Sequence, residues 1–449
     1  MPEELQNMIR AGDVSVESVL IYPSTNANPF DLTFVWNSLS ISESIGSDYV
    51  QATIGFADTQ NLIETIPIIG NEKIIITYRT QGFDESSTFV GRITHIPART
   101  SLNQGSQFVL LEAHDENFVI NQRLKFSKSY KNALISDMVD DIFEEYIKSV
   151  EGSDITIVPT LERESKVIPF YSPMRAIAWL AKWARSPDYR SGVSYVFFKN
   201  RNSYYFGPLE RLLDTDVNVN VAASYKQSTN ILGGDTKNKD LHEGLGNILS
   251  YSIRSHDHLT MMSKGIMAST VITHDPILRT INKKKYNYFN SFDDFKHSNP
   301  HEITNETSLG EFSNSRLLLN PTQHQAFGDG VDSNRTQDVA SIRMSQIEQI
   351  RGTSIQIVVP GDSNRTIGEI VRVDLPSFGK TTLNDTFGDS DKYVSGRYLI
   401  WNLKHEITRD GEGKIVYFTH MRLVKDGNTT ELPAQSANPF GSQSTHSIV

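Results

Sequence analysis

The feature that most constrains the fold of this 449-residue chain is a run of short β-type segments near its C-terminal end. The run extends from Ser354 to Lys425 and is rich in Val, Ile, Tyr and Phe, with turn residues between the segments. Short strands separated by turns are typical of a small antiparallel barrel or sandwich. A weaker copy of this layout lies in the first 115 residues, so the sequence predicts two β domains of one design.

The first copy contains six segments with the composition of strands. They are Glu17–Tyr22, Leu32–Ile41, Tyr49–Gly55, Lys73–Tyr78, Ser87–Ile96 and Gln107–Ala113. Two anchors relate it to the second copy: Ile69–Ile76 parallels Ile367–Val373, and Val90–Ile93 parallels Ser395–Tyr398. Glycine before a strand is common, so the order and spacing of these anchors carry the inference of an internal repeat.

The middle of the chain has a different sequence pattern, because its apolar residues recur at helical spacing. Leu134–Ile147 reads as an amphipathic helix, and a second helix begins with Ser172 as N-cap and Pro173 at the first helical position. A hairpin follows, with strands at Val193–Lys199 and Ser203–Phe206, and Gln337–Ile350 reads as a later helix. Residues 228–246 and 298–336 have few periodic apolar positions and are expected to be loops.

These segments predict a β-rich α+β protein with two homologous small antiparallel β-barrels and a mixed α/β domain. The first barrel is expected at 10–114, and the mixed domain at 115–246, completed by 286–351. The second barrel is expected to combine 247–285 with 352–425. The remaining 426–449 are rich in Ser, Asn, Gln and Pro and are expected to form a mobile C-terminal tail.

Composition narrows the possible functions. The chain has 43 Lys and Arg against 53 Asp and Glu, and a net charge of −10 argues against a general affinity for nucleic acid or anionic membrane. The absence of cysteine excludes disulfides, thiolate catalysis and cysteine-ligated metals. Met1–Asn7 has no apolar stretch, so no secretory signal is expected, and no apolar run reaches the roughly 20 residues that span a bilayer.

Several polar residues are candidates for functional sites. His256 and His258 would share a face of a strand as metal ligands, but no third ligand is identifiable, so ordinary surface or core histidines are favoured. His114 and Asp115 could seed an acid–base pair, yet no nucleophile motif accompanies them. Gly361 and Gly368 lack the lysine and the helix that a phosphate-binding loop needs.

Two predicted helix faces and a run of lysines carry further candidates. Asp140, Asp141, Glu144 and Glu145 suggest paired catalytic carboxylates, but they fall on the polar face of an amphipathic helix and are expected to be solvated. Trp179 and Trp183 lie four residues apart and are expected to pack rather than to hold a sugar. The Lys283–Lys285 run is expected to be a solvated strand end. The sequence therefore predicts no catalytic, cofactor-binding or metal-binding residues.

A family resemblance rests on segments spread over most of residues 10–425. They are Asn61–Ile63, Pro67–Ile76, Phe126–Tyr130, Met174–Ala181, Pro360-Gly361, Gly368 and Ser395–Ile400. In these segments the chain resembles the baseplate hub proteins of contractile-tailed bacteriophages, including the late control protein group. It is also similar to the hub half of type VI secretion spike proteins. The loop-rich 298–336 and the tail 426–449 carry no motif of this family.

The resemblance implies a structural protein without enzymatic activity or cofactor. In that family three chains, each with two homologous barrels, form a pseudo-sixfold ring between a sixfold tail tube and a threefold spike. The expected partners are two further copies, the central spike, the tail tube or tube-initiator protein, and baseplate wedge proteins. DNA would pass only as cargo, no membrane insertion is expected, and the protein would reside in the host cytoplasm during assembly and then in the virion.

Three other functions remain open at this point. A hub of a secretion system or phage-like particle would have the same architecture and would differ in its genomic neighbours. A tail-associated peptidoglycan hydrolase would need a catalytic acid in a cleft, and none is identifiable. A carbohydrate-binding adhesin would favour exposed aromatic residues on loops, whereas the aromatic residues here fall mainly in predicted strands and helices.

Overall fold

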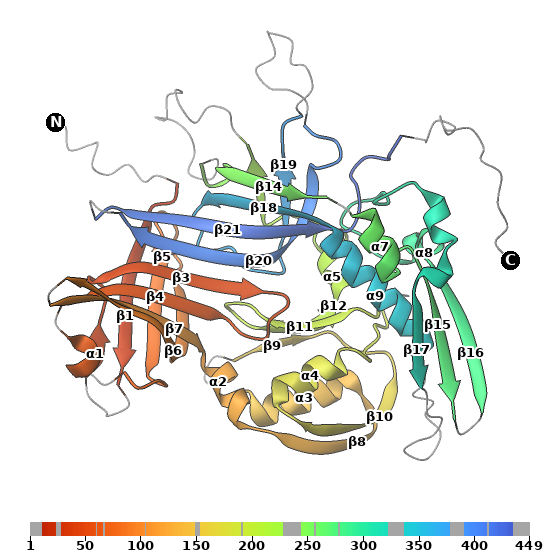
Figure 1. The fold of residues 1–449 in the computed structure, drawn as a ribbon, viewed down its shortest axis with the longest axis horizontal. Helices are drawn as coiled ribbons and strands as arrows, with labels where there is room; N and C mark the ends of the chain where they lie inside the picture. The colour runs from red at the N-terminus through yellow and green to blue at the C-terminus, as the bar shows by residue number, and fades with distance from the viewer. Residues whose placement is uncertain are drawn as a thin grey trace, which may run out of the picture.

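Two sets of strands dominate the computed structural model (Figure 1). It describes residues 11–23, 28–59, 61–65, 68–103, 105–148, 153–189, 192–227, 244–255, 257–276, 279–321, 336–377, 390–410 and 413–433. The first set is β1 (Val14–Tyr22), β2 (Phe30–Asp31), β3 (Trp36–Ser44), β4 (Gln51–Asp58), β5 (Lys73–Thr80), β6 (Ser87–Asn103) and β7 (Ser106–Asp115), with the short helix α1 (Leu62–Thr65) after β4. Every strand expected before His114 is therefore present.

The second set lies mostly near the C-terminal end. It contains β13 (Ala223–Lys226), β14 (Ser250–Arg254), β18 (Thr353–Pro360), β19 (Ile370–Asp374), β20 (Gly396–Arg409) and β21 (Ile415–Lys425). Each set surrounds its own apolar core: Ile54, Ile76 and Leu111 are fully buried in the first, and Val359, Val373 and Leu423 in the second. Burial of alternate residues explains why these β-branched, apolar segments form strands.

The two sets have the same strand order. The first runs β3-β4-β7-β6-β5-β1 and the second runs β14-β18-β21-β20-β19-β13, and the strands follow one another along the chain in the same sequence in both. One difference is that β1 is antiparallel to β5, whereas β13 is parallel to β19. The strands β3 and β20 pair with each other, so both sets belong to one thirteen-stranded sheet.

Backbone hydrogen bonds fix the register of this repeat. Asn71 N donates to Ile93 O at 2.6 Å and Ile93 N to Glu72 O at 2.9 Å. In the second set Gly368 N donates to Ile400 O at 3.1 Å and Ile400 N to Glu369 O at 2.9 Å. Glu72 is therefore equivalent to Glu369, and Ile93 to Ile400.

The observed register differs from the expected alignment of the repeat at both anchors. The Ile-Gly anchor is wrong by one residue, because Asn71 rather than Gly70 occupies the position of Gly368. The two equivalent residues share a left-handed conformation, with φ of 84° at Asn71 and 85° at Gly368, and Asn tolerates it better than most residues. The Gly-Arg anchor is wrong by two residues, since Gly91 lies opposite Ile74 and not at the place of Gly396.

The mixed domain lies below the sheet in Figure 1. It contains α2 (Glu116–Arg123), β8 (Phe126–Leu134), α3 (Ile135–Tyr146), β9 (Ile155–Ile157), β10 (Arg163–Tyr171), α4 (Pro173–Leu180), β11 (Tyr195–Lys199), β12 (Tyr204–Pro208) and α5 (Leu209–Leu213). The predicted helices are confirmed as α3 and α4, which bury Met138 and Ile177 in a shared core. The predicted hairpin is confirmed as β11 and β12.

A fourth group of elements lies to the right in Figure 1. It contains α7 (His258–Lys264), β15 (Ala268–Asp275), β16 (Thr280–Asn287), α8 (Tyr288–Ser291), β17 (Leu317–Pro321), α9 (Thr336–Gly352) and the 3-10 turns η3 (Phe292–Asp294), η4 (Thr307–Gly310) and η5 (Ser313–Ser315). The helix expected over Gln337–Ile350 is confirmed as α9.

Three assignments differ from the expectation. The strands β15 and β16, expected in the second barrel, form a separate sheet with β17, and β13, expected in the mixed domain, pairs with β19. Local composition predicts a strand but not its pairing partner. The expected tail begins as packed chain, because Asp426 and Asn428 are buried and Asn428 exchanges backbone hydrogen bonds with His301. Residues 322–335 and 434–449 lie outside the described residues.

Candidate functional site at the seam between the repeats

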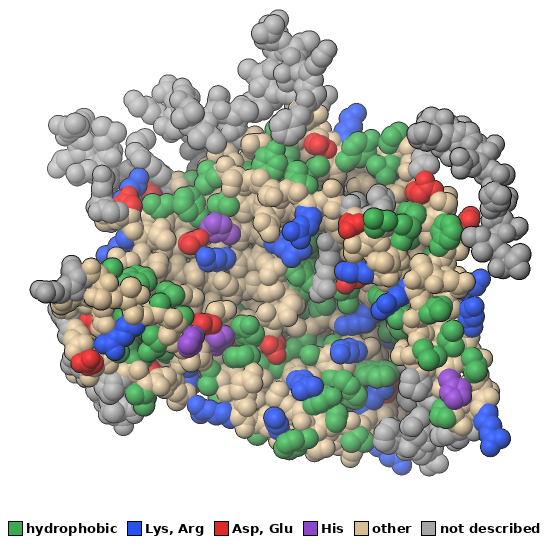
Figure 2. Space-filling view, in the orientation of Figure 1, with side chains coloured by type: hydrophobic (Ala, Val, Ile, Leu, Met, Phe, Trp, Pro, Cys, Tyr) green, Lys and Arg blue, Asp and Glu red, His purple; other side chains and the backbone are tan. Residues whose placement is uncertain are grey.

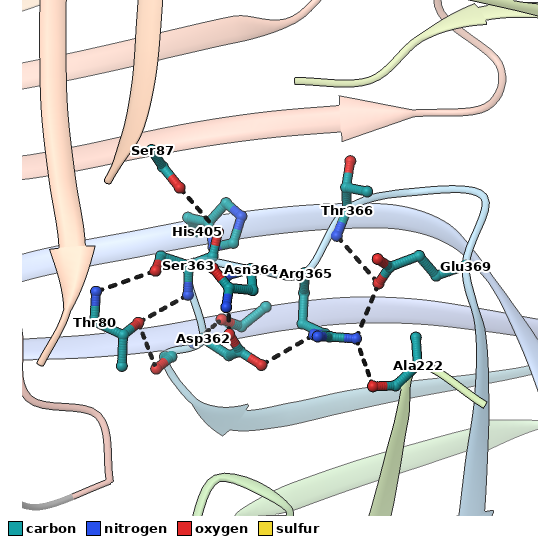
Figure 3. A network of polar contacts seen from close by, with 12 residues as sticks. Thr80, Ser87, Ala222, Asp362, Ser363, Asn364, Arg365, Thr366, Glu369 and His405 are labelled. Atoms are coloured by element: carbon teal, nitrogen blue, oxygen red, sulfur yellow. Dashed lines mark hydrogen bonds and ion pairs between the residues drawn. The ribbon is translucent and has the colours of Figure 1, made fainter. Parts of the chain in front are cut away.

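A network of polar contacts lies where the two strand sets meet. The loop from Gly361 to Glu369, between β18 and β19, lies against the ends of β5 and β6 (Figure 3). Thr80 N donates to Ser363 Oγ at 3.1 Å, and Ser363 N donates back to Thr80 Oγ1 at 2.8 Å. Ser87 Oγ donates to the Ser363 carbonyl at 2.9 Å. These reciprocal bonds fix one repeat against the other.

Arg201, at the tip of the β11–β12 hairpin, ties the mixed domain to the same place. Its guanidinium donates to Ser87 Oγ at 2.7 Å and to the Ser363 carbonyl. Its backbone N donates to Glu43 Oε2 at 3.3 Å, and Thr366 Oγ1 donates to the same oxygen at 2.5 Å. Burial raises the pKa of Glu43, while the nearby charge of Arg201 and the Thr366 hydroxyl oppose the rise. One arginine therefore joins the mixed domain to both strand sets.

A second arginine braces the loop from its other side. Arg365 forms an ion pair with Asp362 at 3.0 Å and another with Glu369 at 3.2 Å. It also donates to the Ala222 carbonyl at 2.8 Å, which brings the start of β13 against the loop (Figure 3). Because the guanidinium is planar and multivalent, it can satisfy two carboxylates and a carbonyl at once.

The buried histidine and tyrosines at the seam are held neutral. Tyr417 and His405 share a hydrogen bond of 2.7 Å between Oη and Nδ1, and both side chains are almost fully buried. Burial and the nearby Arg201 charge lower the pKa of His405 to about 3. Burial raises the pKa of Tyr78 to about 12. A general acid or base must reach its substrate and titrate near the working pH, so this group suits cohesion rather than catalysis.

The candidate residues His114 and Asp115 have structural roles. Asp115 accepts from Val50 N at 3.0 Å and from Phe118 N at 3.2 Å, which caps α2, and it pairs with Lys199 at 2.9 Å. His114 lies 2.8 Å from Thr94 Oγ1 and stacks on the Phe118 ring. Both residues therefore help to fix Phe118 at the start of α2.

The remaining candidates also fall into packing or surface contacts. Asp141 and Glu145 both bind Lys128, at 2.6 and 2.7 Å, and Glu144 binds Lys148 at 2.5 Å. The Trp179 and Trp183 rings lie 6.2 Å apart, edge to face, beside the core of the mixed domain. Lys283–Lys285 are exposed on β16, as expected for a solvated strand.

The structure gives no support to a metal site at the paired histidines. His258 begins α7 rather than sharing a strand, which overturns the premise of a common strand face, and His256 lies outside the described residues. Within the ranges the structure describes, no three His, Asp or Glu side chains gather as metal ligands. In the same ranges, no helix is long and apolar enough to cross a membrane.

A hollow of about 480 Å³ crosses the seam between the two strand sets. Its lining includes Ser42, Gln51, Ser252, Gln356, Asn402 and Lys404. Sequence reasoning missed the seam itself, although one signal was present. Alternate serines at Ser38, Ser40 and Ser42 of β3 are matched by Ser250 and Ser252 of β14.

Comparisons with known proteins agree with this architecture. The chain is 20% identical over 405 residues to the probable baseplate hub protein gp334 of Vibrio phage KVP40, covering 87% of this chain and 89% of that protein. No protein-family model matches the chain.

Two solved structures share its fold. A tail protein from Neisseria meningitidis MC58 superposes with a TM-score of 0.53 at 12% identity, covering 91% of this chain and 97% of that one. The 43 kDa tail protein of prophage MuSo2 from Shewanella oneidensis gives 0.53 at 10% identity, covering 92% and 99%. The chain thus resembles a phage baseplate hub protein in sequence and tail proteins in fold, as its sequence motifs predict.

Proposed function

We propose that this protein is the structural hub of a contractile phage tail baseplate. Three copies would form a pseudo-sixfold ring that adapts a sixfold tail tube to a threefold central spike. The observation that carries the proposal is the strand order shared by the two sets of strands within one chain. A chain with two equivalent modules presents six equivalent positions in a trimer, which is what such an adaptor requires.

The domain assignment follows from the same repeat. The first module comprises β1 to β7 and the second comprises β13, β14 and β18 to β21, each curled around its own core as a small barrel. The mixed domain and the β15–β17 sheet flank these modules and would present the surfaces for the spike and wedge proteins. The tube or its initiator would contact the ends of the modules. The mature protein would reside in the virion tail.

The polar face of the thirteen-stranded sheet would line the channel of this ring. Where this sheet faces the viewer in Figure 2, uncharged polar surface and backbone dominate. On the seam strands Glu406 lies 3.2 Å from Lys404 and 2.8 Å from His420, so a carboxylate offsets positive charge there. A basic lumen would retain DNA by counterion release, so this offset suits DNA that passes as cargo.

We also propose that the protein is not an enzyme. The seam histidine and tyrosines are buried, and the paired carboxylates of α3 are engaged by lysines on an exposed face. Neither group offers a free acid beside a cleft, which a peptidoglycan hydrolase would need.

Mass photometry tests the assembly directly. The purified chain is measured alone and with the spike and tube proteins encoded beside it, and a closed species of three copies is expected in at least the second condition. Electron microscopy of that species should show six similar modules around one channel. A chain that stays monomeric with both partners present contradicts the proposal, as does an open filament.

A further inference from the structure

The seam inside the chain indicates how one copy would join the next. We propose that the edge strand β14 of one copy pairs, antiparallel, with the C-terminal half of β6 in a neighbouring copy. This contact would repeat between chains the β3–β20 contact within each chain. The inference rests on the proposed ring and assigns its chain-to-chain interface to named residues.

The internal seam provides the template. The second half of β20 pairs with β3 over seven positions, from Asn402 opposite Ser44 to Thr408 opposite Ser38. In the first half of β20, the same edge is occupied by β19. One long strand therefore binds a strand of its own module and then a strand of the other module.

Residue equivalence can be carried across each strand set. Ile93 and Ile400 are equivalent and lie opposite Ala113 and Leu423. These in turn lie opposite Ala52 and Ile355, which lie opposite Ile41 and Ile253. The segment Ser38-Leu39-Ser40-Ile41-Ser42 of β3 therefore corresponds to Ser250-Tyr251-Ser252-Ile253-Arg254 of β14. Three of these five paired positions are identical, which supports the alignment independently.

The long strands β6 and β20 correspond in the same way. Both carry an irregularity directly after the anchor isoleucine, at Thr94 in β6 and at Trp401 in β20. A second irregularity, around Pro97, occurs in β6 and brings Ala98 to the position of Lys404. From there Arg99 corresponds to His405, Thr100 to Glu406 and Ser101 to Ile407.

Both proposed partners are open edges in the described part of the chain. After Arg92, β6 pairs with β7 on one side only, and β14 pairs only with β18. Proline lacks an N–H and is confined to strand edges and bulges, and Pro97 lies at a bulge on this edge of β6. Unpaired edges of this kind present backbone donors and acceptors to another strand.

Side chains at the free edge are more exposed than their equivalents at the internal seam, as expected for an edge that another copy would cover. Ile41 is 3% exposed inside the chain, whereas its counterpart Ile253 is 40% exposed. Thr366 is 7% exposed beside Glu43, whereas its counterpart Ile69 is 79% exposed. Ile69 and Thr366 are equivalent because each backbone N–H donates to the carboxylate three residues later, Glu72 or Glu369. Apolar side chains are therefore exposed at the free edge, whereas the equivalent side chains at the internal seam are covered.

The template fixes the register. His405 lies opposite Ile41 and Glu406 opposite Ser40, so Arg99 of the second copy would lie opposite Ile253, and Thr100 opposite Ser252. Because β14 and β6 are different surfaces, the contact is head-to-tail, and three copies close it into a ring. Internal and intermolecular seams would then alternate around the channel.

Disulfide cross-linking tests the register, because the chain has no cysteine of its own. Directly opposed antiparallel residues fall within the Cα separation that a disulfide allows. The S252C/T100C variant is expected to give covalent dimers and trimers that a reductant dissolves. A mixture of S252C copies and T100C copies should stop at dimers, and neither single variant alone should link.

Two matched variants control this experiment. The S40C/E406C variant places cysteines at the equivalent pair of the internal seam and should form a disulfide within one chain, which shows that the oxidant links such strands. The S252C/S101C variant shifts the register by one residue, so its thiols point to opposite faces and should stay free.

The outcomes separate the two proposals. If three-copy rings form but S252C/T100C fails to link while S40C/E406C does, the proposed interface is wrong and the hub function stands. Equal linking by S252C/S101C also overturns the register. If no ring forms with the spike and tube proteins present, the proposed function fails, and this interface fails with it.

Discussion

Arg201 shows how much of this architecture depends on single residues. It reaches from the mixed domain into the seam and bonds Ser87 and Ser363, beside the buried Glu43. Each hydrogen bond to a charged group contributes about 1.5–3 kcal/mol to stability, and a buried group left without its partner adds a desolvation cost. Arg201→Ala is therefore expected to lower the free energy of unfolding by about 2–4 kcal/mol in urea denaturation.

The neighbouring turn residue supplies the control. Asn202 is exposed, so Asn202→Ala should change the free energy of unfolding by less than about 0.5 kcal/mol. Arg201→Lys keeps the charge but not the planar fork and should fall between the two. Equal stabilities for Arg201→Ala and Asn202→Ala would show that Arg201 does not hold the seam.

Glu210 predicts a pH dependence. It is buried in α5, where Gln346 Nε2 donates to it at 2.6 Å, and burial raises its pKa from 4.5 to about 7. The folded state therefore binds this proton more tightly than the unfolded state, so stability falls as pH rises from about 4.5 to 7. Glu210→Gln should stabilise the protein by about 1–3 kcal/mol at pH 8 and little at pH 4.

Urea denaturation at the two pH values measures this difference. Glu431→Gln, on an exposed residue, is the matched control and should show no such dependence. A Glu210→Gln variant that is less stable than the parent at pH 8 would mean that the carboxylate is charged and usefully paired in the folded protein.

At the scale of elements, β3 and β14 are equivalent strands of the two sets, and they lie in different environments. Ile41 is covered by β20, whereas Ile253 lies on an open edge. Ile41→Ala is expected to lower the free energy of unfolding by about 2–5 kcal/mol, as for a buried core residue. Ile253→Ala should lower the free energy of unfolding of the isolated chain by less than about 1 kcal/mol, because the side chain is partly exposed. Its main effect should be to weaken assembly.

Mass photometry over a dilution series measures the assembly effect. Ile281→Ala removes an equally large exposed side chain from β16, outside the proposed interface, and is expected to leave assembly unchanged. Comparable losses of assembly in both variants would contradict the special role of β14.

Sequence periodicity predicts helices and strands better than it predicts which strands pair with each other. The apolar stripe of α3 and the serine–proline start of α4 are local features, and both helices form as expected. Nothing local distinguishes β15, which pairs with β16 and β17, from β18, which joins the main sheet. Both are short apolar strands, and the pairing depends on residues far away in the sequence.

At the scale of the whole molecule, the proposed channel face predicts how the ring treats DNA. Each copy has a net charge of −10, and Lys404 on the seam face is paired with Glu406. The assembled protein should not bind duplex DNA at about 0.15 M salt, where the Debye length is about 8 Å. Lysines introduced at Ser40 and Ser252, on the proposed channel face, should create salt-dependent binding.

Fluorescence anisotropy with labelled duplex DNA measures this effect. Lysines at Thr280 and Asn282, exposed on β16, add the same charge elsewhere and should give weaker binding. Binding by the unmodified ring at that salt would refute the channel assignment.

The sequence by itself determined the strands of the first set, the main helices and the resemblance to hub proteins, and it predicted the duplicated design, because periodicity and turn residues act locally. Only the tertiary structure decided the register of the repeat, the union of both modules through β3 and β20, and the role of Arg201. It also left β14 and half of β6 open. The physical reason is that strand pairing and buried polar bonds join residues hundreds of positions apart, and local sequence patterns do not record which distant edge will meet them.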